Sequence, residues 1–358
     1  MDLWHVVTGS IAICGLVQLS PSLPPRIATA AGAAPATVSA APATADLERD
    51  PVVFVVADGV RWQEIFQGTD PRLAAGTDAP RLDAPALTPQ LHSIIDETGA
   101  AIGAPGRASI EASGPRFVSL PSYREIFSGQ ASLDCLDNQC PTIERTTLVD
   151  ELRDRGGKAA VFSSWPTIAR AAARRTEGVV LSTGLSPSDG AVEPYPGDDG
   201  FRPDRLTARA ALEHLESARP DFLFLGLGEP DEYAHRGDYA GYVASVQAVD
   251  RTIGELRATL ARMGARGKRT HIFVTTDHGR AKSFRDHGGA YPESAAVWLI
   301  AWGPSFQARG ALVTEPRHHL ADLAPTARLI LALPAVSRGA GGGAVLRELF
   351  DAAGVASR

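Results

Sequence analysis

The sequence predicts an α/β fold with a mostly parallel central sheet and helices on both faces. Short apolar runs have the composition of buried strands at Pro51–Ala57, Ala159–Phe162, Phe222–Leu227, His271–Thr275 and Val297–Ala301. Apolar residues recur at helical spacing in the segments Thr147–Arg155, Leu206–Ala218 and Tyr239–Met263. Strands that alternate with helices favour parallel pairing. Each crossover helix covers a face of the sheet and returns the chain to the end where the previous strand began, so the next strand runs in the same direction.

The first strand is the clearest element, since Pro51–Ala57 is apolar throughout and stops at the turn pair Asp58-Gly59. The longest helix, Tyr239–Met263, keeps its apolar side chains on one face, and Gly264 is expected to end it. Proline, glycine and aspartate residues between Ser182 and Arg205 predict a long surface loop over one edge of the sheet.

Composition and charge exclude several classes of protein. Of the 358 residues, 44% are hydrophobic and 21% are charged, which is typical of a soluble globular chain. The 41 acidic and 35 basic residues give a net charge of −6, so no basic surface for nucleic acid is expected. Three cysteines are too few for a disulfide scaffold. No apolar run approaches the roughly 18 residues that a transmembrane segment needs.

The amino-terminal residues differ in composition from the rest. Residues 1–30 are predicted to be a signal peptide, because Ile11–Leu19 forms a short apolar run and Ala28-Thr29-Ala30 matches a cleavage pattern. The run is preceded by no lysine or arginine, so a misassigned start or a buried amphipathic segment remains an alternative. Residues 31–48 are predicted to be a flexible tether rich in alanine and proline, followed by a single domain over 49–358. We therefore expect a periplasmic or secreted protein. The chain from Gly339 is expected to form a glycine-rich linker and a closing helix.

Acidic residues follow three of the predicted strands. Asp58, Asp231 and Asp277 each come shortly after a strand, and ligands of such sheets bind beyond the carboxyl ends of the strands. Three converging carboxylates would repel one another unless cations lay between them. The sequence therefore predicts a metal centre at this edge.

Histidines accompany two of these acidic residues. His235 follows Asp231 by four residues, a spacing that lets both side chains face one point. His278 is adjacent to Asp277, and His287 follows in the same loop. Mixed carboxylate and imidazole ligands suit Zn²⁺ best, with Mn²⁺ or iron as alternatives.

A serine precedes a predicted helix in the segment Phe117–Gly129. Ser119 would lie at the amino end of that helix, where free backbone N–H groups favour an anion. A metal ion in contact with Ser119 would lower the pKa of its hydroxyl group and make it a nucleophile. Alternatively, Ser119 is only a helix cap.

In this order, these residues resemble the alkaline phosphatase superfamily of two-metal phosphohydrolases and sulfohydrolases. They are most similar to the type I phosphodiesterase/nucleotide pyrophosphatase branch. The matching motifs are Ser119-Leu120-Pro121-Ser122-Tyr123, Glu229-Pro230-Asp231 with His235, Asp277-His278-Gly279 and His287-Gly288. The resemblance runs from about Val52 to Thr326 and implies an alkaline phosphatase-like fold.

The resemblance implies two divalent metal ions and a small anionic phosphate ester as substrate. One ion would be held by Asp231, His235 and His287, and the other by Asp58, Asp277, His278 and the oxygen of Ser119. His318 or His319 remains an alternative to His287. Ser119 would attack phosphorus to give a phosphoserine that water then hydrolyses. Ser122 and Tyr123 would contact the substrate.

This sequence departs from the family patterns at three positions. Ser119 replaces the threonine of the branch, and Ser122 replaces an asparagine that donates to a phosphate oxygen. Tyr123 replaces the arginine of the similar sulfatase motif, which disfavours a sulfatase. A sulfatase-like enzyme and a non-catalytic metal-binding or ligand-binding module of the same fold remain the alternatives. Cys135 and Cys140 are expected to form a disulfide if the protein is exported, and free thiols otherwise.

Overall fold

The computed structural model describes residues 49–186, 200–313, 317–335 and 341–351. The predicted signal peptide and tether, residues 1–48, lie outside the described residues. Among the described residues, no helix is long and apolar enough to cross a membrane.

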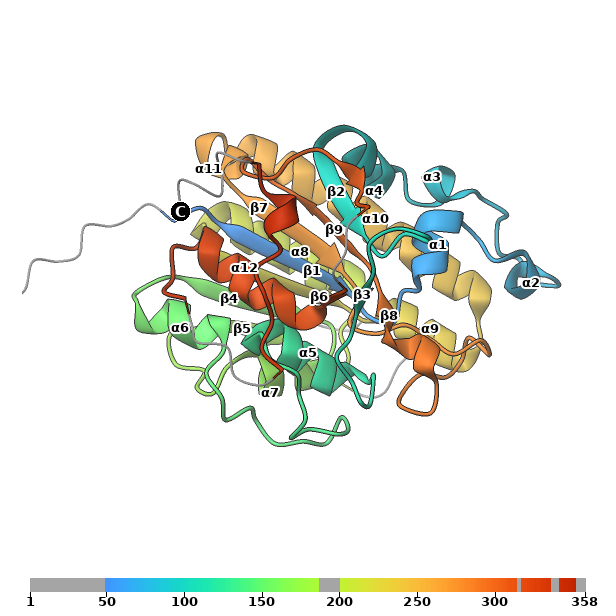
Figure 1. Ribbon diagram of the computed structural model, residues 1–358, viewed down its shortest axis with the longest axis horizontal. Coiled ribbons are helices and arrows are strands. Elements are labelled where there is room, and N and C mark those ends of the chain that lie inside the picture. Colours follow the sequence, from blue (N-terminus) through green and yellow to red (C-terminus); the bar gives the residue numbers. More distant parts are fainter. Residues whose placement is uncertain (1–48, 187–199, 314–316, 336–340, 352–358) are drawn as a thin grey trace, which may run out of the picture. The chain divides into compact units, whose positions relative to one another are not determined.

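A central sheet, with eight strands among the described residues, organises the domain (Figure 1). The strand order is β10-β2-β9-β7-β1-β6-β4-β5. Five neighbouring strands, β7, β1, β6, β4 and β5, are parallel, whereas β9 runs antiparallel to β7 and β2. The strands are β1 (Val52–Ala57), β2 (Gly99–Ile102), β4 (Ala159–Ser163), β5 (Val180–Thr183), β6 (Phe222–Leu227), β7 (His271–Thr275), β9 (Leu299–Trp302) and β10 (Gly310–Ala311). The predicted fold class is confirmed.

The predicted strand at Val297–Ala301 is divided between two sheets. Its first part belongs to β8 (Ala296–Val297), which joins β3 (Ile110–Glu111) and β11 (His318–His319) in a small three-stranded sheet. The remainder forms β9. Trp298 lies between the two strands, fully buried, and its Nε1–H donates to the carbonyl of Val60 at 2.8 Å. This anchored side chain accounts for the break.

Helices cover both faces of the sheet (Figure 1). The α-helices are α1 (Trp62–Gln67), α2 (Pro71–Ala74), α3 (Ala84–Leu87), α4 (Pro89–Ser93), α5 (Ser119–Ser128), α6 (Leu148–Asp154), α7 (Ala169–Ala172), α8 (Asp204–Ala218), α9 (Glu229–Arg236), α10 (Tyr239–Arg262), α11 (Ala265–Lys268) and α12 (Leu323–Ile330). A π-helical turn, η1 (Ile94–Thr98), follows α4, and the 3₁₀ turns are η2 (Pro166–Ile168), η4 (Pro292–Ala295), η5 (Leu320–Asp322) and η6 (Arg347–Leu349).

Two expectations about connections need correction. The predicted loop at Ser182–Arg205 is too long, because Ser182 and Thr183 end β5 and α8 begins at Asp204, whereas residues 187–199 lie outside the described part. The closing helix expected after Gly339 is only the turn η6 within the described residues 341–351. In both places, the polar residues and glycines of the sequence do not indicate which residues contact segments far away in the chain.

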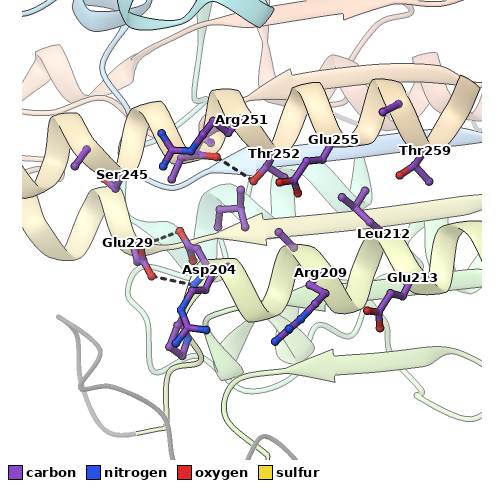
Figure 2. A pocket seen from close by; sticks show the side chains of 18 of the residues that line it. Asp204, Arg209, Leu212, Glu213, Glu229, Ser245, Arg251, Thr252, Glu255 and Thr259 are labelled. Carbon is purple, nitrogen blue, oxygen red and sulfur yellow. Dashed lines mark hydrogen bonds between the residues drawn. The ribbon is translucent and has the colours of Figure 1, made fainter.

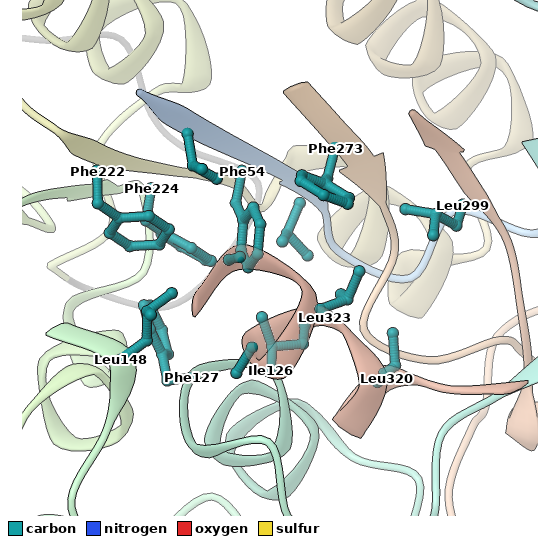
Figure 3. Close-up of a cluster of buried hydrophobic side chains, with 14 of the residues drawn as sticks. Phe54, Ile126, Phe127, Leu148, Phe222, Phe224, Phe273, Leu299, Leu320 and Leu323 are labelled. Carbon is teal, nitrogen blue, oxygen red and sulfur yellow. The ribbon is translucent and has the colours of Figure 1, made fainter. Parts of the chain in front are cut away.

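The strand β1 separates two hydrophobic clusters. Phe54 points to the face covered by α5, α6 and α12, where its ring meets Phe222 and Phe273 edge-on at centroid distances of 5.2 and 5.1 Å (Figure 3). Val53 and Val55 point to the opposite face, which α4, α8 and α10 cover. Burial on both faces explains why β1 is apolar throughout.

A buried histidine ties the described C-terminal segment to this core. His318 in β11 is buried, with Nε2 2.7 Å from Glu348 Oε1 in η6 and Nδ1 3.7 Å from Asp322 Oδ2 in η5. Burial lowers the pKa of His318, but the interactions of its imidazolium with Asp322 and Glu348 outweigh burial and raise the pKa to about 9.

Replacing His318 with glutamine is expected to destabilise the protein in a pH-dependent way. The pKa of about 9 in the folded state exceeds the ordinary value of 6.5, so the charged imidazole stabilises the fold below pH 6.5. This contribution disappears as the pH rises through about 9. Urea unfolding should show a loss of about 1–3 kcal/mol in mildly acidic buffer and almost none in strongly alkaline buffer. A loss that is constant with pH would contradict this assignment.

Candidate metal centre

Three neighbouring strands end in the acidic segments singled out from the sequence. β1 pairs in parallel with β6 on one side and with β7 on the other, and Val52 lies opposite both Phe222 and His271. The carboxyl ends of the three strands therefore meet at one edge of the sheet. Asp58, the helix α9 and Asp277 follow these ends.

Gly59 lets the loop after β1 pass close to the other acidic segments. Its φ of 63° lies in the left-handed region, and a Cβ there would lie 2.3 Å from Asp231 Oδ1. Its backbone N–H donates to Asp277 Oδ1 at 3.1 Å. The glycine therefore turns the chain and orients a carboxylate of the site.

The helix α9 carries Asp231 and His235 on one face, and α8 holds its amino end in place. Asp204 Oδ1 and Oδ2 accept from the N–H groups of Gly228 and Glu229 at 2.9 and 3.0 Å, and Glu229 Oε1 accepts from the Asp204 N–H at 3.0 Å (Figure 2). Burial, together with the charge of Glu229, raises the pKa of Asp204 to about 7. Asp204 therefore holds the amino end of α9, and the side chain of Glu229 in turn caps α8.

The first candidate metal site, site A, consists of Asp231, His235 and His287. His235 Nε2 lies 2.9 Å from Asp231 Oδ2 and 3.1 Å from His287 Nε2, and His287 Nε2 lies 3.9 Å from Asp231 Oδ1. His287 Nδ1–H donates to the carbonyl of Phe117 at 3.1 Å, which leaves Nε2 as the ligand atom. His318, by contrast, pairs with Asp322 and Glu348.

The second candidate metal site, site B, consists of Asp58, Asp277 and His278. His278 Nε2 lies 3.4 Å from Asp58 Oδ1, 3.4 Å from Asp277 Oδ2 and 3.3 Å from Ser119 Oγ. His278 Nδ1–H donates to the carbonyl of Gly279 at 3.0 Å, so Nε2 faces the three oxygens. Site B thus gathers four of the residues predicted for one metal ion.

The donor atoms of both sites fit a tetrahedral divalent ion. Ligands at roughly 2.0–2.1 Å from Zn²⁺ lie about 3.3 Å from one another in a tetrahedron, close to the separations observed here. In the described part of the chain, the buried oxygens Asp58 Oδ1 and Asp277 Oδ2 accept no hydrogen bond. Buried carboxylate oxygens without partners are costly, and a bound cation would satisfy both.

Two of the site histidines are in the protonation state that metal binding requires, whereas the carboxyl groups of Asp58 and Asp277 release protons when a cation binds. Burial and the neighbouring Asp277 raise the pKa of Asp58 well above its usual range, and burial with Asp231 raises the pKa of Asp277 to about 7. Burial lowers the pKa of His278 to about 4 and that of His287 to about 3, so both imidazoles are neutral. Neutral imidazoles present the lone pairs that metal ions bind.

Ser122 and Tyr123, the predicted substrate contacts, are both buried in α5. The Tyr123 hydroxyl donates to Asp58 Oδ2 at 2.9 Å, which orients this carboxylate toward site B. Substrate contact by these residues stays a prediction, whereas the support of Asp58 by Tyr123 was not expected from the sequence.

Replacing Tyr123 with phenylalanine is expected to weaken metal binding by roughly 10- to 100-fold, because residues that orient a ligand contribute on this scale. Competition with a chromophoric chelator would measure the change. Tyr239→Phe is a matched control, since the Tyr239 hydroxyl donates to Glu64 instead of a site residue. Equal metal affinity in Tyr123→Phe and the unmodified protein would contradict the assigned role.

The helix α5 presents Ser119 at its first position, and a disulfide loop caps it. Asn138 Oδ1 accepts from the N–H of Leu120 at 2.9 Å. Asn138 lies between Cys135 and Cys140, which are joined by a disulfide. The cap therefore comes from a cross-linked loop, and Ser119 keeps its hydroxyl toward His278.

Arg280 is a site residue that sequence analysis missed. Its guanidinium NH1 donates to Asp231 Oδ1, and its NH2 lies 3.5 Å from His235 Nδ1. Burial would raise the pKa of Asp231, but Arg280 and His287 outweigh it and hold the pKa well below its usual range. The signal in the sequence was a basic residue directly after Asp277-His278-Gly279.

Comparison with known proteins identifies a partial family match and a common fold. Residues 201–335 match the model of the Metalloenzyme superfamily. This match covers less than half of the chain and includes Asp231, His235, Asp277, His278 and His287. Solved structures of similar fold include murine ectonucleotide pyrophosphatase/phosphodiesterase 5, with a TM-score of 0.57 and 13% identity over 84% of this chain and 100% of that one.

Two further solved structures share the fold. The phosphonate monoester hydrolase of Agrobacterium radiobacter has a TM-score of 0.57 and 16% identity over 84% of this chain and 77% of that one. A 2-O GAG sulfatase has a TM-score of 0.61 and 14% identity over 84% and 74%. Identities this low show the common fold alone.

The curated relatives match only part of the chain. The 2,3-bisphosphoglycerate-independent phosphoglycerate mutase of Moorella thermoacetica is 30% identical over 161 residues, which cover 40% of this chain and 29% of that protein. That of Natronomonas pharaonis is 38% identical over 72 residues, or 20% of this chain and 13% of that protein. The matches thus span less than a third of these relatives.

Proposed function

We propose that this protein is a phosphoric ester hydrolase that uses Ser119 as its nucleophile and two divalent metal ions, with Zn²⁺ as the expected metal. The observation that carries the proposal is the position of Ser119 Oγ. It lies 3.3 Å from His278 Nε2, beside the unpartnered oxygens of Asp58 and Asp277, at the amino end of α5. A phosphoryl group at this point would meet a hydroxyl group and the bound cations.

The reaction proceeds in two displacements. Ser119 Oγ attacks phosphorus, the bond to the leaving-group oxygen breaks, and that oxygen takes a proton. Water then attacks the phosphoserine, the bond from phosphorus to Oγ breaks, and Ser119 regains its proton. When bound, the two ions would supply Lewis-acid stabilisation of negative charge and a lower pKa for the hydroxyl groups beside them.

Phosphate esters are preferred to sulfate esters as substrates because of the residue at position 123. Tyr123 is buried and its hydroxyl is committed to Asp58, so this position offers no cationic side chain to the nucleophile. We also propose that the protein acts in the periplasm or outside the cell. The disulfide between Cys135 and Cys140 supports this location, because disulfides persist in oxidising compartments.

The test combines metal analysis with three aryl esters: a phosphate monoester, a phosphate diester and a sulfate. With Zn²⁺ supplied in excess, the protein is expected to bind about two zinc ions per chain and to hydrolyse phosphate esters until a chelator is added. The ratio of monoester to diester turnover would indicate the branch of the superfamily. Turnover of the sulfate alone would favour a sulfatase. Absence of both metal and turnover would contradict the proposal and favour a binding module.

A further inference from the structure

Sites A and B differ in their exposure to solvent. In site B, the side chains of Asp277 and His278 are 0% exposed and that of Asp58 is 7% exposed. In site A, the side chain of His235 is 42% exposed. Site A is therefore the more exposed of the two sites, through the side chain of His235.

The two sites also differ in charge. Site B combines two carboxylates with an imidazole, and each carboxylate has an oxygen without a hydrogen-bond donor among the described residues. Site A has a single carboxylate, Asp231, which already binds the guanidinium of Arg280. Site B therefore attracts a divalent cation strongly, while the ligand charge of site A is already balanced.

Burial and hydrogen bonds hold the side chain of Arg280 in one position. Its side chain is 0% exposed, and its Nε–H and NH2 groups donate to the carbonyls of Phe284 and Arg285. The ring of Phe284 lies 5.9 Å from the guanidinium carbon of Arg280 and 5.4 Å from that of Arg61 on this buried side of the loop. These partners hold the guanidinium group of Arg280 next to site A.

We propose that the two metal sites differ in their affinity for a metal ion because of the residues around them. Site B retains its ion, whereas site A binds its ion weakly and exchanges it with solvent because Arg280 places a fixed positive charge against Asp231. The inference rests on the proposed function, since it assigns different affinities to the two metal positions. It makes Arg280 a positioning residue that acts through Asp231.

Zinc titration of the chelator-treated full-length protein tests the proposal without any activity assay. With a chromophoric chelator as competitor, Zn²⁺ is expected to bind in two steps whose dissociation constants differ by about 100-fold or more. His235→Ala should remove only the weaker step, and Asp277→Asn should weaken the tighter step. Two equal steps, or loss of the tighter step in His235→Ala, would overturn the proposal.

Arg280→Gln tests the origin of the difference. The variant removes the charge but keeps a side-chain amide that can donate to Asp231, and the weaker step is expected to tighten by about tenfold or more. Lys282→Met is the matched control, because Lys282 is an 86% exposed cation in the same loop that pairs with Glu293. An unchanged or weaker second step in Arg280→Gln would overturn the role of Arg280. If neither the parent protein nor any variant binds Zn²⁺, both this inference and the proposed function are contradicted. If the parent protein binds Zn²⁺ in two equal steps, only this inference is contradicted.

Discussion

Substitution of Ser119 by alanine is expected to lower the turnover of phosphate esters by roughly 10⁴-fold or more, the scale seen when an enzyme loses its nucleophile. Metal content should stay near that of the unmodified protein, because Asp58, Asp277 and His278 still provide three ligands of site B. Steady-state assays together with elemental analysis would measure both quantities.

Ser128→Ala is a suitable control for this variant. Ser128 lies at the other end of α5, where its hydroxyl donates to the carbonyl of Gln130. It should retain full turnover. Acid quenching during turnover should also give a phosphoryl group on the peptide that contains Ser119. Unimpaired turnover in Ser119→Ala would exclude the serine mechanism and favour direct attack by water.

Asp277→Asn is expected to change stability in opposite directions with and without metal. In the metal-free protein, Asp277 is a fully buried carboxylate close to Asp58, and an uncharged amide removes part of this cost. Thermal unfolding should show that the metal-free variant is more stable by on the order of 1–3 kcal/mol. Added Zn²⁺ should stabilise the parent protein but have much less effect on the variant.

The control for this comparison is Asp286→Asn. Asp286 is an exposed carboxylate of the same loop, and it accepts from the hydroxyl of Ser283 at 3.2 Å. Its replacement should leave both the metal-free stability and the response to Zn²⁺ unchanged. A decrease in metal-free stability in Asp277→Asn would show that the carboxylate is satisfied by the protein itself.

The central strands were predictable from the sequence because they are buried on both faces. Phe222–Leu227 and His271–Thr275 have the predicted bounds, and β1 begins one residue later than expected. By contrast, β2 (Gly99–Ile102) was missed, since glycine and alanine carry little strand signal and the strand depends on pairing with β9. The antiparallel direction of β9 could not be predicted either, because an apolar run does not specify which neighbouring strand it pairs with.

The acidic and histidine residues of the site were predictable because they follow strands that end at one edge. Their grouping into sites A and B follows from the parallel register of β1, β6 and β7. The supporting residues were not predictable in their roles. Tyr123 reaches Asp58 across 65 residues of sequence, and Arg280 reaches Asp231 across 49. Such contacts exist only after the sheet has brought the loops together.

The cap on α5 has a consequence for how the protein is handled. Asn138 reaches the helix that carries Ser119 from a loop that Cys135 and Cys140 close. If the protein is made in a reducing cytoplasm, this loop loses its covalent constraint, and the order of the helix end next to the nucleophile falls with it. Preparations from reducing and oxidising hosts should therefore differ in activity at equal metal content, and mild reoxidation should bring them together.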